Sequence, residues 1–391
     1  MVKLRFDFRD IFRAARLALS LQRLWIQAVG LFFGYLGYLI FTYIAILTTG
    51  AQFKAVWLRY GLLPHIGMYQ LSWYGYVLFG LGLLIFILFW MATSTAVARA
   101  VYMHLKGFSF YTWKDTFKFS LSKVGSIIAT PLSIGAIAFF TGLGGVIIGL
   151  LGKIAFIGEL GVSLFTPVWF LASVFIVFII LGFGVSLLLT PSILATTDDD
   201  AFEGIFQSFS TTYSQPWRLV IYEILLFAVS VAGFLLMSLF FKQAWKLMNM
   251  ILIWGMGEKF VDLSYKASYL LQNWTYPAIL WSKSILGDYT SYFFFTRTFI
   301  SIEISAVLNI SSWIMAIFLV FIGGYLISYP IAIFNSGNSI IFLILKKKKD
   351  DENLLERKDR EEEEDEVDLE DAGESDKKIQ PSKDSKQKDK K

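Results

Sequence analysis

Six long runs of apolar residues, separated by polar or charged segments, dominate the pattern along this chain. The runs cover residues 24–48, 72–96, 126–151, 168–195, 219–241 and 312–345. A helix needs about 20 apolar residues to cross the hydrocarbon core of a bilayer, so each run is long enough for one span. The pattern predicts an all-α integral membrane protein with about six transmembrane helices arranged as three hairpins.

The first and last runs differ from the others. The first is too long for the core of a signal peptide and lacks a clear small-residue cleavage site, which favours an uncleaved span. The last is longer than one span and contains Pro330 and Gly337. We expect the helix to kink or break there before it emerges at Lys346.

Three segments that lead into spans resemble one another. "RDIFRAARLAL" begins at Arg9, "KDTFKFSLSKV" at Lys114 and "EGIFQSFSTTY" at Glu203, each with a charged residue three positions before a phenylalanine. Their apolar positions recur at intervals of three and four, the stripe of an amphipathic helix. We interpret them as interfacial helices of a unit that occurs three times. The alternative is that any flank rich in Phe and Lys would look similar.

Residues 242–306, between the last two runs, depart from this unit. They mix apolar residues with several tryptophans and spaced lysines, and tryptophan favours the boundary between membrane and water. We expect helices that lie on the outer leaflet or cap the bundle, because the charges come too often for a further span.

Basic residues predict the orientation. Lysine and arginine are frequent before residue 24, after residue 96 and at the end of the last run, whereas the short connections on the opposite side carry few. Such basic flanks stay in the cytoplasm. Both termini are therefore predicted to be cytoplasmic, with the protein in the cytoplasmic membrane of a bacterium.

Composition divides the chain into two parts. The whole chain is 56% hydrophobic, too apolar for a soluble domain. Residues 346–391 hold 14 of the 35 basic and 18 of the 31 acidic residues, a net charge of −4, whereas residues 1–345 are net +8. A segment so charged, with few aliphatic and no aromatic residues, does not bury enough surface to fold. We expect a membrane domain at 1–345 and a disordered cytoplasmic tail at 346–391.

Catalytic motifs are largely missing. The chain has no cysteine, and only His65 and His104 supply imidazoles. The nearest match to a phosphate-binding loop, "GLGGVIIGLLGKI", has its first glycine displaced and Ile154 where a hydroxyl is needed. Dinucleotide, zinc and nucleophile-elbow motifs are also absent. We predict no enzymatic activity, no metal or other cofactor, and no nucleic-acid partner.

Polar side chains at membrane depth are the first candidates for a functional site. Glu223 lies in the fifth run, five residues after Arg218, and Asn335 and Asn338 lie in the sixth. A carboxylate that reaches water at the interface is one interpretation of Glu223, and a proton- or ion-coupled role is the other. The two asparagines could face it from the last span.

An acidic stretch opens the third interfacial segment. Asp198, Asp199 and Asp200 suit a helix start, where carboxylates cap free N–H groups and meet the positive end of the helix dipole. The two sister segments are basic, and anionic lipid would repel three aspartates. We therefore predict that they face a protein or the sister helices.

The junction after the last run carries two kinds of charge. Lys346, Lys347, Lys348 and Lys349 are candidates for contact with anionic lipid. The acidic run "EEEEDEVDLED" that follows would be repelled from that surface and left available to a basic protein partner. A tail that only solubilises the protein is the alternative.

Three segments carry a resemblance to known proteins. They are "VARAVYMHLKGFSFYTWKDTFKFSLSKVGSIIATPL", "TPSILATTDDDAFEGIFQSFSTTYSQPWRLVIYEIL" and "FNSGNSIIFLILKKKKDDENLLE". In this order they resemble a group of bacterial polytopic membrane proteins over about residues 95–355. The plan is more loosely similar to the membrane domain beside some glycerophosphodiester phosphodiesterases, whose catalytic domain has no counterpart here. The resemblance implies a membrane protein and no particular activity.

These observations predict a non-enzymatic integral membrane protein that organises protein or lipid partners. The alternative is a transporter or permease component for a lipidic or amphipathic substrate. A carrier of hydrophilic solutes is disfavoured, because such carriers hold polar groups near the membrane midplane and the second to fourth runs contain almost none. The pattern does not define an oligomeric state.

Overall fold

The computed structural model describes residues 4–67, 69–108, 110–287 and 299–357. The described chain is all-helical, and six of its helices are long and apolar enough to cross a membrane. They are α2 (Leu21–Leu47), α4 (Trp73–Lys106), α6 (Val124–Leu151), α8 (Thr166–Thr197), α10 (Pro216–Met256) and α13 (Ala306–Asp350). The predicted helical class is confirmed, as is the presence of six helices long and apolar enough to cross a membrane.

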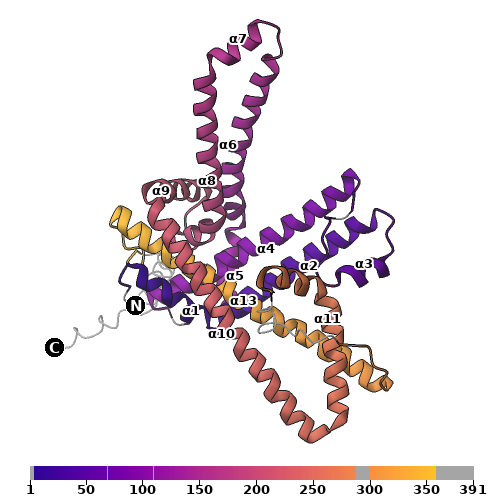
Figure 1. Cartoon of the computed structure of the whole chain (residues 1–391). Coiled ribbons are helices and arrows are strands. Elements are labelled where there is room, and N and C mark those ends of the chain that lie inside the picture. Colours follow the sequence, from indigo (N-terminus) through magenta and orange to yellow (C-terminus); the bar gives the residue numbers. More distant parts are fainter. Residues whose placement is uncertain (1–3, 68, 109, 288–298, 358–391) are drawn as a thin grey trace, which may run out of the picture.

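Each of the six long helices packs mainly against the long helix next to it in the sequence, which gives three pairs. α2 packs on α4, α6 on α8 and α10 on α13. The three pairs extend in different directions from one central region (Figure 1). We call this region, where α13 packs against α1, α2, α4, α8 and α10, the hub. Two short helices, α3 (Phe53–Tyr60) and α7 (Ile157–Leu164), lie towards the far ends of the first two pairs. The long helix α11 (Glu258–Leu286) lies towards the far end of the third.

Short helices precede each pair at the hub. The 3-10 helix η1 (Phe8–Phe12) and α1 (Arg13–Ala18) precede α2, α5 (Trp113–Ser122) precedes α6, and α9 (Ala201–Ser214) precedes α10. The Thr112 hydroxyl and the Asp115 carboxylate form a capping box at the start of α5, which satisfies backbone N–H groups that have no partner within the helix.

α9 packs on the hub with its small and polar residues. Gly204, Ser208 and Thr211 are buried, whereas Phe202 and Phe206 are 76% and 56% exposed. Phe202 and Phe206 therefore point away from the protein, whereas Phe209 packs against Gly182 of α8. The small and polar face of the helix makes the main contact with the hub.

The hub is built around the second half of α13. This helix contacts α1, α2, α4, α8 and α10, and every residue from Asn335 to Lys346 is buried. The largest core cluster joins apolar residues of η1, α1, α4, α8 and α10 to this part of α13. Residues far apart in the sequence thus share one core, and the three helix pairs are joined at their bases.

α13 does not break where the sequence suggested. It runs as one helix through Pro330 and Gly337 to Asp350. Gly337 serves close packing instead, since a Cβ atom there would lie 2.1 Å from Cδ1 of Leu226 on α10. The absence of a side chain lets the two helices approach each other.

The segment 242–306 also differs from expectation over its first part. α10 continues without interruption from the predicted span to Met256, and α11 then returns to pack against α13. The rings of Trp274 on α11 and Trp313 on α13 lie 5.3 Å apart. An extended helix pair therefore replaces the surface-lying helix expected for residues 242–256.

The sequence predicted a disordered tail from residue 346, but the first residues of that segment are folded onto the core. Residues 346–350 form the last turn of α13, and the side chains of Leu354 and Leu355 are 1% and 3% exposed. The hydroxyl of Tyr102 on α4 donates a hydrogen bond to the carbonyl of Leu354 at 2.9 Å. Two buried leucines and this hydrogen bond therefore hold the start of a charged segment on the core. The remainder of the predicted tail, residues 358–391, lies outside the described residues.

Candidate functional site

The polar stretch of α13 connects three helices at the centre of the hub. The side-chain amide of Asn335 donates a hydrogen bond to Oε1 of Gln27 on α2 at 2.7 Å. The amide of Asn338 donates to the carbonyl of Leu188 on α8 at 3.5 Å. The hydroxyls of Ser339 and Ser192 lie 3.4 Å apart. The two asparagines are thus directed at α2 and α8, not at Glu223 as the sequence suggested.

Gln27 is a partner that the sequence analysis missed. It lies near the start of the first apolar run and is 2% exposed. A primary amide three residues inside an apolar run is the signal that could have revealed it, because an amide at that depth needs a hydrogen-bond partner.

Glu223 and Arg218 lie on α10 but do not share an interaction. Arg218 is exposed, and its guanidinium donates to Oε1 of Gln215 at 3.1 Å. Oε1 of Glu223 is buried without a hydrogen-bond partner among the described residues. Glu223 is therefore partly buried, with one carboxylate oxygen enclosed, whereas the Arg218 guanidinium is at the surface.

The acidic stretch lies against a sister segment and the residues that follow α13. Oδ1 of Asp198 forms an ion pair with Nζ of Lys123, directly after α5, at 2.7 Å, and the two side chains are 8% and 16% exposed. Nζ also donates to the main-chain carbonyl of Asp198 at 2.7 Å. Oδ1 of Asp199 lies 3.8 Å from a guanidinium nitrogen of Arg357.

Asp200 has a separate role in the same stretch. Its carboxylate accepts a hydrogen bond from the backbone N–H of Glu203 at 3.1 Å and caps α9. The three aspartates therefore contact three different parts of the hub: Lys123, Arg357 and the first turn of α9.

Arg99 is a second residue whose environment was not anticipated. The sequence analysis counted its region among the basic flanks, but α4 continues to Lys106 and Arg99 is fully buried. Its guanidinium lies 4.2 Å from the ring centroid of Phe119 and donates to the carbonyl of Ala195 at 3.1 Å. The small residues around it, Ala96, Ala98 and Ala100, were the available sign of close packing.

The four lysines at the end of α13 have unequal environments. Lys346 is buried, and its Nζ lies 2.8 Å from Asp350 and 3.4 Å from Glu352. Lys347 pairs with Asp351 at 2.8 Å, and this hydrogen bond lowers the pKa of the Asp351 carboxyl. Lys349 lies 3.4 Å from Asp350, and Lys348 is exposed. Lys346 is therefore a hub residue, and Lys348 is the lysine best exposed for contact with lipid.

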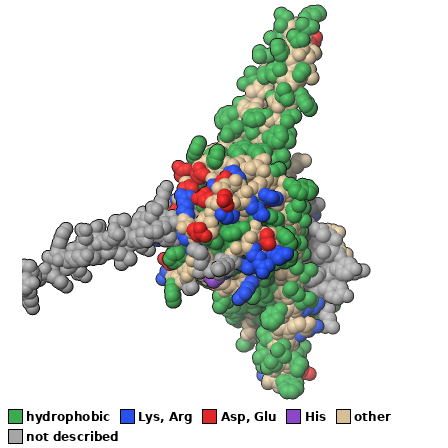
Figure 2. Space-filling model, turned by 90° about the vertical axis from the view of Figure 1, so that its left-hand side faces the viewer, with side chains coloured by type: hydrophobic (Ala, Val, Ile, Leu, Met, Phe, Trp, Pro, Cys, Tyr) green, Lys and Arg blue, Asp and Glu red, His purple; other side chains and the backbone are tan. Residues whose placement is uncertain are grey.

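Charged side chains gather over the hub. Figure 2 shows the basic and acidic groups clustered around the middle of the molecule, with hydrophobic side chains along the helices that project from it. This face carries the end of α13 and the acidic stretch.

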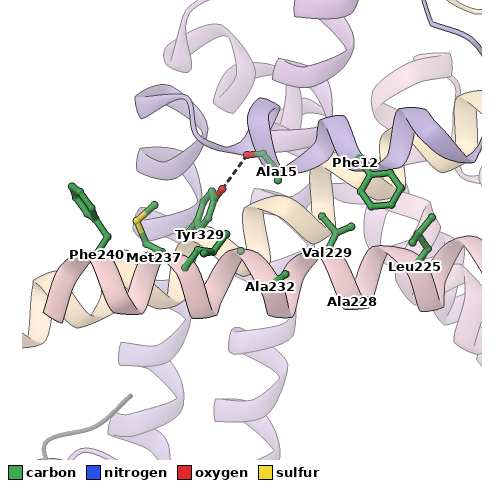
Figure 3. A pocket seen from close by; sticks show the side chains of 11 residues that line it. Phe12, Ala15, Leu225, Ala228, Val229, Ala232, Met237, Phe240 and Tyr329 are labelled. Atoms are coloured by element: carbon green, nitrogen blue, oxygen red, sulfur yellow. Dashed lines mark hydrogen bonds between the residues drawn. The ribbon is translucent and has the colours of Figure 1, made fainter. Parts of the chain in front are cut away.

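A groove of about 500 Å³ lies between α10, the N-terminal segment and α13 (Figure 3). Its lining is apolar apart from one hydroxyl, that of Tyr329, which donates to the carbonyl of Ala15 at 3.2 Å. The α10 positions lie on one face of the helix: Leu225, Ala228, Val229, Ala232, Gly233, Leu236, Met237 and Phe240. Sequence analysis missed this groove because it depends on which elements pack beside α10.

Within the described residues, no group of three or more His, Cys, Asp or Glu side chains is arranged to hold a metal ion. No protein-family model, curated protein sequence or solved structure matches the chain.

Proposed function

We propose that this protein is a non-enzymatic integral membrane protein that organises lipid or protein partners in a bacterial cytoplasmic membrane. The observation that carries the proposal is the use of the polar residues of α13. Asn335, Asn338 and Ser339 join that helix to α2 and α8, and all three are buried. Because these polar side chains bond to other helices of the protein, they favour a structural role over contact with a transported substrate.

In this proposal the three helix pairs are membrane hairpins and α1, α5 and α9 are interfacial helices. The exposed phenylalanines of α9 support this placement, because an interfacial helix buries its apolar face in the bilayer. The charged hub face and both termini would then lie in the cytoplasm, as the distribution of basic residues indicates. The acidic residues beyond Arg357 would be available to a basic protein partner.

Copurification tests this function. The full chain and a chain ending at Arg357 would be gently solubilised from native membranes, and the copurified proteins and lipids identified by mass spectrometry. The truncation keeps Leu354 and Leu355, so the hub stays intact. We expect a discrete set of protein partners with the full chain that is lost with the tail. Identical protein profiles for both chains and for membranes without the protein would contradict a partner bound by the tail.

The apolar groove favours the second candidate, a transporter of a lipidic or amphipathic substrate. The partly buried carboxylate of Glu223 would be its proton-coupling group. Movement of a fluorescent phospholipid between leaflets of reconstituted vesicles measures this activity. Unchanged flux in a Glu223→Gln variant would exclude proton coupling through Glu223, and absence of flux in the wild type would exclude lipid transport.

A further inference from the structure

We propose that the groove along α10 holds one acyl chain of an anionic phospholipid, with the phosphate at the arginine-rich end of the groove. The inference rests on the proposed membrane function and makes it specific, since it names one class of lipid partner and the surface that binds it.

The shape of the groove matches a single hydrocarbon chain. Its lining on α10 runs from Leu225 to Phe240, which are 15 residues apart, or about 22 Å along a helix axis. One leaflet of a bilayer is about 15 Å deep in hydrocarbon. The groove is therefore long enough for one acyl chain and part of its glycerol region.

The middle of the groove is hollow because its residues are small. Ala228 and Ala232 lie between Leu225 at one end and Phe240 at the other (Figure 3). Gly233 lets α13 approach α10, since a Cβ atom there would lie 2.4 Å from Cδ1 of Ile333. Ala15 and Tyr329 close the side away from α10. Because the Tyr329 hydroxyl is bonded to the Ala15 carbonyl, the interior presents hydrocarbon surface and suits an acyl chain better than a polar solute.

Charge defines which end receives the headgroup. Phe12 and Leu225 lie together at one end of the groove (Figure 3). Arg218 lies two helical turns before Leu225, on the same face of α10, and Arg13 follows Phe12 directly. Asp7 is the acidic residue of this neighbourhood with its side chain at the surface, and it pairs with Arg9 at 3.9 Å.

The second acidic residue there, Asp10, is already neutralised. Its carboxylate accepts hydrogen bonds from the backbone N–H groups of Arg5 and Phe6 and forms an ion pair with Arg13 at 3.3 Å. Asp7 and Asp10 offset Arg9 and Arg13, so the excess positive charge at this end is that of Arg218, whose guanidinium donates to the neutral side-chain amide of Gln215. This charge favours a phosphate that lacks a compensating positive group, as in phosphatidylglycerol, over zwitterionic phosphatidylcholine.

Lipid retention by the full chain tests the proposal. The protein would be reconstituted in vesicles of phosphatidylglycerol and phosphatidylcholine in equal amounts, extracted in mild detergent, and its bound lipid measured by native mass spectrometry. We expect one retained phosphatidylglycerol per chain. Ala232→Phe fills the groove and should reduce retention at least tenfold, whereas Val231→Phe, at an exposed position next to it, should leave retention unchanged.

A second pair of variants tests the headgroup. Arg218→Gln should lower the preference for phosphatidylglycerol over phosphatidylcholine roughly fivefold, the effect of one basic residue near a lipid surface. Lys118→Gln, an exposed basic position on α5, is the matched control and should have no effect. Equal retention in wild type and Ala232→Phe would overturn the proposal. A change of oligomeric state in Ala232→Phe, with lipid unchanged, would also overturn it and assign the groove to a second copy of the chain.

The two proposals fail differently. If the wild type retains no phosphatidylglycerol, the groove proposal fails, but the proteins that copurify through the tail are unaffected. If no protein copurifies through the tail, the proposed function fails, but lipid retention in the groove is unaffected.

Discussion

The side-chain amide of Asn335 donates a hydrogen bond to Oε1 of Gln27 at 2.7 Å, across 308 positions of sequence. The bond joins α2, near the start of the chain, to the central helix α13. Both residues are buried, so the bond gives the Gln27 carbonyl and the Asn335 NH2 group a partner where water is excluded. This pair is the clearest sign that the polar residues of the spans hold the hub together.

Replacing either member of this pair should destabilise the hub. Asn335→Leu leaves the amide of Gln27 buried without its partner, and we expect a loss of about 1–3 kcal/mol. The double variant Gln27→Leu with Asn335→Leu should recover part of it, with a coupling energy of about 0.6 and at most ~1.7 kcal/mol, as for hydrogen bonds between membrane helices. Reversible unfolding in mixed detergent micelles measures both. Strictly additive effects would show that the bond contributes nothing.

The ion pair between Asp198 and Lys123 predicts a strong asymmetry within the acidic stretch. Asp198→Asn leaves a mostly buried ammonium group without its carboxylate, and we expect a loss of roughly 3 kcal/mol. Asp200→Asn is the control, because asparagine caps a helix as well as aspartate does. Thermal unfolding followed by circular dichroism compares the two. Equal melting temperatures for the two variants would remove the structural role assigned to Asp198.

Leu355 should matter for stability although it lies in a segment rich in charge. Leu355→Ala removes a side chain that is 3% exposed, and the expected cost is about 2–5 kcal/mol. Leu121→Ala, on α5 at 66% exposure, should be nearly neutral. A chain ending at Asp350 should melt at a lower temperature than one ending at Arg357. If both truncated chains melt together, the contacts of Leu354 and Leu355 do not form in solution.

The capping box of α5 predicts a pH dependence. The Thr112 hydroxyl bonded to Asp115 holds the pKa of that carboxyl below its ordinary value. A carboxyl with a lowered folded pKa stabilises the protein above its unfolded value near 4, and this contribution is lost as the pH falls through the folded value. Thr112→Ala should therefore cost about 1 kcal/mol at pH 7.

The pH series supplies its own control. The difference in melting temperature between wild type and Thr112→Ala should shrink below about pH 4. A difference that stays constant down to pH 3 would mean that the carboxylate of Asp115 plays no part in the cap.

The sequence predicted the helices better than it predicted their contacts. Apolar length alone locates six spans, because the bilayer imposes the same requirement on each. It places the end of the second span at residue 96, but α4 continues to Lys106. The residues from Ala96 to Met103 and Leu105 are buried in the hub, where burial by neighbouring helices replaces burial in lipid, and hydropathy alone does not register this.

The site residues show the same limit. Asn335 and Asn338 were recognisable as polar groups at depth, but Gln27, 308 positions away, was not identifiable as a partner without the packing. Arg99 carries a charge that composition assigns to a membrane flank, and only tertiary structure shows it beneath Phe119. The groove along α10 depends on the position of η1 and α1, which no local pattern encodes.

The central claim is that the hub is a fixed joint around α13, and a disulfide across it tests this most directly. The chain has no cysteine, and the hydroxyls of Ser192 and Ser339 lie 3.4 Å apart, so Ser192→Cys with Ser339→Cys places two thiols close enough to bond after a small adjustment. Each single variant is a control. Because thiols on the cytoplasmic side stay reduced, isolated native membranes would be treated with an oxidant such as copper phenanthroline, and the proposed framework predicts near-complete crosslinking with copurified lipids and proteins unchanged. Absence of the crosslink, or loss of those partners once it forms, would contradict it.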